Sequence, residues 1–478
     1  MRNLVIELGN PGLDPTVFHH ILRYKPAEDF ILPNMETLKV VFHRRVDFDH
    51  SALFIGANVK KLHLCLPKED VEHLETHLGT YASRMPNLSH LEIDSTQVDF
   101  PMAKIQRFLL KWISGLRGLE HFVCAPYLAT PEVLSALFRI PSLRTIGIGT
   151  VDFKGAGQVK DVLQFCPSLP AEGLGSIETL SFCSDYGDAA KLLDAMDAPK
   201  LKYVTIAAAT VVTADSLHRL LSVLGKRYSG IRTLSLEAAR YVTSPLRQRR
   251  FGDSEDLDVV TLSVLRPLLR FAELEALRIS YHRPFRVTDS DLEKIVAGLP
   301  YLTVLDFCAD PVLAKEPLIT AAIIPIISQR CPNISDLALY IDSRAPDPSL
   351  APSNAGYRVE LANVRKVRFG TSPIAEDDVF GFASYLSKFL RPDCEIDGLA
   401  DIRWLDRKEV QEYRSNSLFN EIYSLRWNHV SSLLKILVMV WEEKRNVQNL
   451  SSRADALGAR VSVVAAEGRR RLSLIPLC

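Results

Sequence analysis

One short pattern of apolar and variable positions recurs along the chain. It begins with a small or polar residue, an aliphatic residue and two variable positions. An aliphatic residue, one variable position and an aliphatic residue or Phe then follow, as expected of a short strand with one buried face. Twelve copies, and so twelve predicted strands, begin at Asn34, Asn58, Asn87, Gly118, Ser142, Ser176, Lys200, Gly230, Glu273, Tyr301, Asn333 and Asn363.

The segments between the copies have the pattern of amphipathic helices. Two of them place apolar residues at the i, i+3, i+4, i+7 spacing of one helix face. These are Leu217, Leu220, Leu221 and Leu224, and Leu292, Ile295, Val296 and Leu299. The sequence therefore predicts alternating strands and helices.

Helix start signals support this alternation. Thr130 precedes Pro131, which predicts a capping residue followed by proline at the first helical position. Thr288 and Asp291 have the spacing of a capping box. Asp188, just before an apolar run, is predicted to cap a third helix.

The spacing of the copies indicates the fold class. Most intervals are about 24 to 34 residues, with one of about 43, near the 20–29 of leucine-rich repeats with their L-x-x-L-x-L core. A doubly wound sheet is the alternative, but its strands would be continuous apolar runs, whereas Lys61, Glu92 and Arg278 interrupt these strands. We therefore predict an α/β leucine-rich-repeat solenoid, ribonuclease-inhibitor-like with irregular repeats, whose stacked units share one core.

The two ends differ from the repeats. Residues 1–8 have the pattern of the remainder of an earlier unit, so we expect the sequence to begin late, and a degenerate last unit begins at Ser384. We predict a solenoid over residues 1–398 and a helical C-terminal cap and tail over residues 399–478. The tail helices, which either cover the end of the solenoid or bind a partner, are predicted from Leu418, Ile422, Leu425, Val430, Leu434, Leu437 and Trp441.

Two further features mark the repeats as irregular. Segments 247–258 and 344–356 are predicted to be solvated loops, with docking of a partner as the alternative. The third position after each predicted strand, an asparagine in many such families, holds Asp185 or Asp310 in some copies and Ala209 or Ala239 in others. A continuous asparagine ladder after the strands is therefore not expected.

Composition limits the classes of partner and compartment. The formal net charge is +0, so no long-range field favours nucleic acid or a membrane surface. The longest largely apolar stretch, residues 433–441, is too short to span a bilayer, and no secretory signal is evident. The eight cysteines occur singly, without a C-x-x-C pair, so we expect reduced thiols in an intracellular protein of the cytoplasm or nucleus.

No pattern of catalytic or ligand-binding residues is found. His73 and His77 have the i, i+4 spacing of metal ligands, but the zincin motif requires Glu directly after the first His. The sequence holds no G-x-S-x-G elbow and no G-x-G-x-x-G or Walker A spacing. We therefore predict a non-enzymatic protein with no catalytic, cofactor-binding or metal-binding residues.

The variable strand positions are the remaining candidates for function. They are basic or imidazole-bearing early, including His90 and His121, hydroxyl-rich in the middle and charged late. Repeat solenoids bind large protein surfaces on their concave side. We predict protein binding on this face by Lys61, His63, Glu92, Arg278, Asp306 and Arg368; an ordinary solvated face is the alternative.

Three stretches carry a resemblance to a known family. CPNISDLALYI from Cys331, CPSL from Cys166 and SYLSKFLRPDCEI from Ser384, followed by tryptophan-bearing helices, resemble the F-box/leucine-rich-repeat proteins of mushroom-forming fungi over roughly residues 1–445. The resemblance implies an F-box that binds the Skp-type adaptor of a cullin ubiquitin ligase, and repeats that select substrates. The nearest stretch, residues 13–22, lacks the Leu-Pro and Glu of an F-box, so either the gene is truncated or the F-box is absent.

Two functions therefore remain open. The resemblance implies substrate recognition of the F-box/ubiquitin-ligase type, with a protein substrate and, if an F-box exists upstream, a Skp-type adaptor as partners. The alternative is a ligase-independent scaffold or inhibitor protein.

Overall fold

A computed structural model of the 478-residue chain describes most of the repeat array and one helix of the tail. The described residues are 2–7, 15–24, 32–41, 50–51, 53–66, 81, 83–95, 102, 105–148, 158–163, 165–169, 174–238, 258–311, 316–344, 363–391, 393–397, 425–440, 443 and 451.

The strands form one sheet in the order in which they occur in the chain. Each pairs in parallel with the next, from β1 to β14. They are β1 (Asn3–Glu7), β2 (Thr37–Val41), β3 (Lys61–Leu66), β4 (His90–Ser95), β5 (His121–Cys124), β6 (Thr145–Ile148), β7 (Thr179–Ser184), β8 (Tyr203–Ala208), β9 (Thr233–Glu237), β10 (Ala276–Ser280), β11 (Val304–Phe307), β12 (Asp336–Leu339), β13 (Lys366–Arg368) and β14 (Glu395–Asp397). The twelve predicted strands are β2 to β13.

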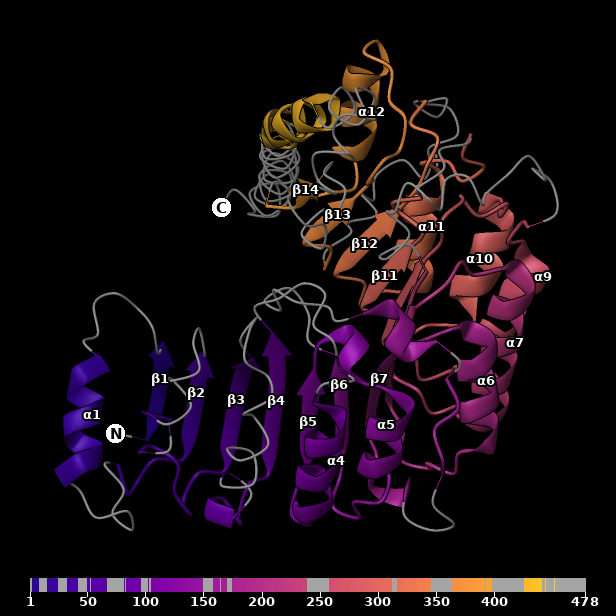
Figure 1. Ribbon diagram of the computed structural model, residues 1–478. Helices are drawn as coiled ribbons and strands as arrows, with labels where there is room; N and C mark the ends of the chain where they lie inside the picture. The colour runs from indigo at the N-terminus through magenta and orange to yellow at the C-terminus, as the bar shows by residue number, and fades with distance from the viewer. Residues whose placement is uncertain are drawn as a thin grey trace, which may run out of the picture.

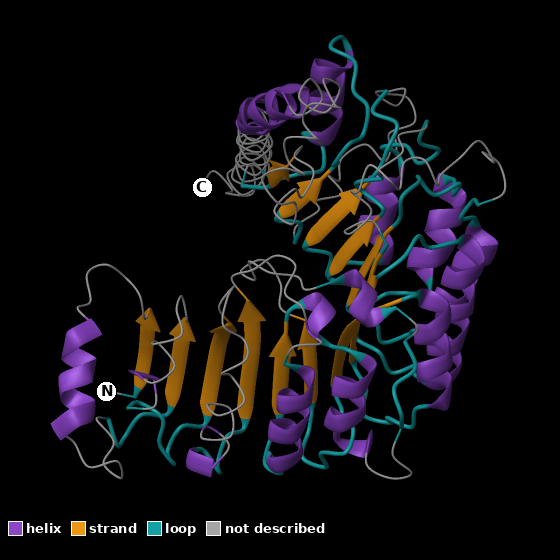
Figure 2. Cartoon of the chain, in the orientation of Figure 1, coloured by secondary structure: helices purple, strands orange, loops and turns teal. Residues whose placement is uncertain are grey.

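The helices lie along one side of this sheet. The sheet curves along its length, with helices on the outer side and strands lining the inner side (Figure 1 and Figure 2). The α-helices are α1 (Pro15–Tyr24), α4 (Gln106–Gly115), α5 (Pro131–Leu137), α6 (Tyr186–Ala195), α7 (Ala214–Arg227), α9 (Leu262–Leu265), α10 (Asp289–Ala297), α11 (Ile323–Arg330) and α12 (Asp378–Leu386), with 3-10 turns η3 (Pro126–Leu128), η4 (Val159–Val162), η5 (Leu174–Ser176) and η6 (Arg266–Arg270).

The connectivity decides between the two fold classes. A strictly sequential parallel order leaves one face of the sheet open, whereas a doubly wound sheet reverses its strand order and is covered by helices on both faces. The chain is therefore an α/β leucine-rich-repeat solenoid.

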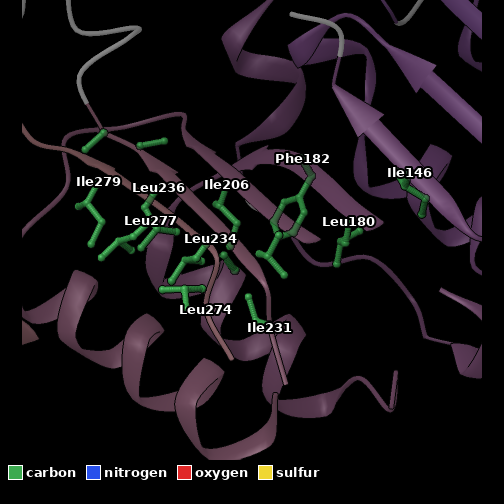
Figure 3. Close-up of a cluster of buried hydrophobic side chains, with 14 of the residues drawn as sticks. Ile146, Leu180, Phe182, Ile206, Ile231, Leu234, Leu236, Leu274, Leu277 and Ile279 are labelled. Atoms are coloured by element: carbon green, nitrogen blue, oxygen red, sulfur yellow. The ribbon is translucent and has the colours of Figure 1, made fainter. Parts of the chain in front are cut away.

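One continuous core runs through the stacked units. Equivalent strand positions lie in register, so that Ile206 faces Leu236 and Leu236 faces Ile279 on neighbouring strands. Figure 3 shows these side chains stacked behind the sheet. Both predicted helix stripes, on α7 and α10, are buried in the same core. Because burying one such side chain contributes about 1.5–3 kcal/mol, the stacking of many units stabilises the array.

Helix capping agrees with the sequence at two positions and differs at a third. The side chain of Thr130 accepts from the N–H of Val133 at the start of α5, and Thr288 with Asp291 forms a capping box on α10. The prediction that Asp188 caps a helix is wrong, since α6 begins earlier, at Tyr186, and is capped by Asp185. Asp188 lies in the first turn of α6, where its carboxylate interacts favourably with the positive end of the helix dipole.

In several repeats the first residue of the pattern links its unit to the preceding one. Asn58 donates from its side chain to the carbonyl of Pro33 at 2.7 Å, and Asn363 donates to that of Pro332 at 2.9 Å. Ser142 serves the same purpose, donating to the Leu119 carbonyl at 2.8 Å. Side-chain hydrogen bonds therefore join neighbouring units before some of the strands, whereas the sequence-based expectation concerned only the positions after the strands.

Both ends of the array extend one unit beyond the twelve copies. β1 pairs with β2 over Asn3 to Glu7, as predicted for the first eight residues. Phe18 of α1 stacks on His50 at 5.1 Å and contacts Phe54 at 6.0 Å. The F-box-like stretch thus contributes the helix of the first repeat. At the other end β14 confirms the degenerate last unit.

A helix over residues 425–440 packs on the last units. Trp427 is fully buried, stacks on Phe369 at 4.5 Å and donates from Nε1 to the carbonyl of Ser372 at 3.0 Å. Val430 and Leu434 are buried in the main core as well. Leu418, Ile422, Trp441, His73, His77 and nearly all of both predicted insertions lie outside the described residues.

Candidate functional site

The inner face of the sheet carries the variable strand positions side by side. Because the strands are parallel and in register, each variable position forms a row that crosses the repeats. One row runs Lys39, His63, Glu92, Val123 and Gly147 from β2 to β6. A second, parallel row includes Thr37, Lys61, His90 and His121.

Three of the predicted binding residues gather at the N-terminal end of this face. His63 lies beside Glu92 in register, with Nδ1 3.6 Å from the Glu92 carboxylate and Nε2 3.1 Å from the Asp94 carboxylate. Lys61, two positions before His63, is exposed. The imidazole therefore engages the two nearby carboxylates, and the neighbouring ammonium group projects from the surface.

Next to Lys61 lies a pair of stacked histidines that the predicted set of binding residues omits. The rings of His90 and His121 stand 4.1 Å apart and 17° from parallel. Burial lowers the pKa of His90, and His121 and Lys61 lower it further, while Glu120 acts in the opposite direction. The repeated pattern places both histidines in one row, but only the register shows that they stack.

The middle of the face is neutral. On β6, β7 and β8 the described side chains of the two rows are Thr145, Gly147, Thr179, Ser181, Tyr203 and Thr205. Most are small hydroxyl-bearing side chains, and Tyr203 is 40% exposed. This part of the face offers hydrogen bonds and one aromatic ring without charge.

The other three predicted residues gather at the C-terminal end. Arg278 faces Asp306 in register, and Arg368 lies two strands beyond Asp306, across Ala338. Arg368 forms ion pairs with Asp306 and with Asp310, the latter at 2.9 Å. The six predicted residues thus form two groups separated by β5 to β9.

The two arginines of this group have different environments. The Arg368 side chain is only 14% exposed, because its guanidinium is held between two carboxylates. Arg278 is exposed, and no ion pair links it to any other part of the chain that the structure describes. Arg278 is therefore available to a partner, whereas Arg368 links the repeat of β13 to that of β11, across β12.

The thiols and the potential metal ligands among the described residues bear on the chemistry that the chain can perform. Burial raises the pKa of the Cys331 thiol to about 11 and that of Cys394 to about 12, so both stay protonated near neutral pH. Groups of three or more potential metal ligands are absent from the described ranges. In the same ranges, every helix is too short or too polar to cross a membrane.

Comparisons with known proteins give distant similarity only. No family model matches the sequence, and no curated protein matches it. The solved complex of Rad7 and Elc1 from yeast is similar at 15% identity and a TM-score of 0.37, over 74% of this chain and 83% of that one.

The leucine-rich-repeat ectodomain of the Arabidopsis thaliana receptor kinase GASSHO1/SCHENGEN3, in complex with CASPARIAN STRIP INTEGRITY FACTOR 2, is similar at 10% identity and a TM-score of 0.30. That similarity covers 77% of this chain and 44% of the other. Similarities this distant carry no argument about function, and the fold class is assigned from the sheet itself.

Proposed function

We propose that the chain is a non-enzymatic, intracellular protein-interaction solenoid that binds a protein partner on the inner face of its sheet. The observation that carries this proposal is the inner face itself, where fourteen parallel strands present their variable positions on the side away from the α-helices (Figure 1). Tyr127 of η3 and Val162 of η4 cover this face at Cys183 and Ala207. Surfaces of this length suit large protein interfaces, which bury about 800 Å² on each partner. In this proposal residues 1–398 bind the partner, and residues 399–478 cover the end of the array.

The finer proposal is that the partner is a substrate for ubiquitination. It is supported by the resemblance of the Cys331 and Ser384 stretches to F-box/leucine-rich-repeat proteins. The second candidate is a ligase-independent scaffold or inhibitor. It is favoured by the position of residues 15–24, which form the helix of the first repeat with Phe18 packed against the next unit.

A photo-crosslinking experiment tests the inner face. Benzoylphenylalanine replaces Thr205 on β8 in one variant, and Arg139, which follows α5 on the outer side, in a matched control. We expect partners from native cells to crosslink through position 205 and much less through position 139. Equal crosslinking at both positions would refute binding on the inner face.

Co-purification separates the two finer functions. The full chain is incubated with purified Skp-type adaptor, with a known F-box protein as the positive control. Recovery of the adaptor with this chain supports the ligase function. Failure to recover it, while crosslinked partners are retained at position 205, supports the scaffold or inhibitor.

A further inference from the structure

We propose that the inner face binds an extended polypeptide segment in which about ten residues with small, neutral side chains separate two acidic ends. The proposal rests on the proposed function, because it assigns a chemistry to the partner that the inner face receives. Its basis is the distribution of charge along the face. Cations without an ion pair in the described part of the chain lie on both sides of β6 to β8, where the two rows of variable positions carry no charge.

Three cations of the face have no ion pair within the described part of the chain. Lys39 and Lys61 lie on neighbouring strands at the N-terminal side, with Lys61 exposed. Arg278 is exposed on β10. Exposed cations on a binding face attract carboxylates, and arginine pairs with them through two hydrogen bonds.

The neighbouring carboxylates are already engaged within the protein. His63 holds both Glu92 and Asp94. Arg368 holds Asp306, the register neighbour of Arg278, together with Asp310. These carboxylates lie against His63 and Arg368, and none of them forms an ion pair with Lys61 or Arg278 in the described part of the chain. A ligand carboxylate is therefore the complementary group for each of these two cations.

The surface between the cations matches a neutral segment. The variable positions of β6 to β8 carry threonine, serine, glycine and one tyrosine. An incoming charge would be desolvated there without a counter-charge, which costs free energy unless the charge is paired. Tyr203, 40% exposed in the middle of this surface, offers a rigid aromatic contact of the kind that dominates binding energy in many interfaces.

The length of the segment follows from the spacing of the strands. Seven strand steps separate β3, which carries Lys61, from β10, which carries Arg278. At about 4.8 Å for each step they span roughly 34 Å along the sheet. An extended chain advances about 3.4 Å per residue, so about ten residues bridge the two cations.

Labelled synthetic peptides test the spacing. Each peptide carries two glutamates at each end, separated by about 4, 10 or 16 residues of Ser, Thr, Ala and Gly, and binding to the full chain is measured by fluorescence anisotropy at low salt. We expect the middle spacer to bind at least roughly fivefold more tightly than the shortest, because about four residues are too few to reach both cations. Equal affinity for all three spacers would overturn the proposal.

Charge reversals identify the anchors. Lys61→Glu and Arg278→Glu should each weaken the middle peptide roughly tenfold, since attraction becomes repulsion at one end. Arg139 is an exposed cation that follows α5, and Arg139→Glu is the matched control. This variant should bind the middle peptide within about twofold of the unaltered chain. A peptide in which lysines replace the glutamates at one end should bind the Arg278→Glu variant with restored affinity. If this peptide does not restore binding, or if Arg139→Glu loses as much affinity as the other two variants, the proposal is contradicted.

The peptide experiment and the crosslinking experiment can fail independently, so failure of this proposal can be distinguished from failure of the proposed function. If position 205 crosslinks to partners but no peptide shows spacing dependence, the inner face binds protein and the acidic-ended segment is refuted. If position 205 fails to crosslink preferentially, the proposed function itself fails. Thermal unfolding of each variant confirms that the exposed substitutions leave the fold intact.

Discussion

The N-terminal and C-terminal parts of the inner face use charge in different ways. Lys39 and Lys61, on β2 and β3, have no ion pair within the described part of the chain. On β13, by contrast, Lys366 pairs with Asp397 at 3.3 Å, and Arg368 pairs with Asp306 and Asp310. Within the described residues, the same repeat positions therefore hold unpaired cations on β2 and β3 and fasten neighbouring units on β13.

The contact between Arg368 and Asp306 crosses a strand that carries a small residue. Arg368 and Asp306 lie two strands apart in one row, with Ala338 between them. A long side chain at 338 would obstruct the path, whereas the methyl group of alanine lets the guanidinium pass over it.

The largest loss of stability is expected for a substitution in the helix over residues 425–440, which packs on the last units. Trp427→Ala should lower the free energy of unfolding by about 3–5 kcal/mol, because a fully buried indole stacked on Phe369 is lost. Urea unfolding followed by circular dichroism measures the change. Leu425→Ala is the control in the same helix, since Leu425 is 61% exposed. A loss of the same size in both variants would mean that Trp427 is not the anchor.

A second test uses the backbone of the C-terminal part. Gly370 has φ +51°, and a Cβ there would overlap the Ala309 carbonyl and the Asp310 carboxylate. Gly370→Ala should therefore cost roughly 2–4 kcal/mol. Gly230→Ala, where the added Cβ meets nothing within 4 Å, should cost less than about 1 kcal/mol. Similar urea midpoints for the two variants would contradict this explanation.

The two arginines provide the most direct test of the comparison. Arg368→Ala leaves two nearby carboxylates without their cation and should cost about 2 kcal/mol, an intermediate value for a partly buried network. Arg278→Ala should change stability by less than about 0.5 kcal/mol while weakening partner binding. If Arg278→Ala lowered stability and Arg368→Ala affected only binding, the roles given to the two arginines would be wrong.

Much of this architecture could be predicted from the sequence, because hydrophobic periodicity encodes it directly. The alternation at Asn58 and Glu273 predicts β3 and β10, and the leucines of α7 predict its buried stripe. The start of α6 could not be placed, since Asp185 and Asp188 both have the chemistry of a cap. Only the backbone geometry distinguishes the capping residue from one in the first turn.

Which predicted residues act together could not be read from the sequence. Arg368 and Asp306 are 62 residues apart in the chain, and their contact depends on register and on a small residue at 338. Arg278 and Arg368 occupy equivalent positions of the repeat, so the pattern treats them alike. Their different roles follow from long-range neighbours, which the spacing of a single repeat does not specify.

The smallest effect concerns the histidine pair at the N-terminal part of the face. The pKa of His90 is lowered by burial, by His121 and by Lys61, with Glu120 opposing and Ser89 hydrogen-bonded to Nδ1. A ligand carboxylate bound beside Lys61 would favour the imidazolium and raise that pKa, so binding takes up protons. Affinity for the acidic-ended peptide should therefore increase roughly two- to threefold as the pH falls from about 8 to about 6. The His90→Asn variant should bind the peptide with a weaker dependence on pH, as measured by anisotropy. The control variant His218→Asn, on α7, should keep the full dependence.

An affinity that falls with decreasing pH would contradict this prediction and would place the peptide's carboxylates away from this histidine pair.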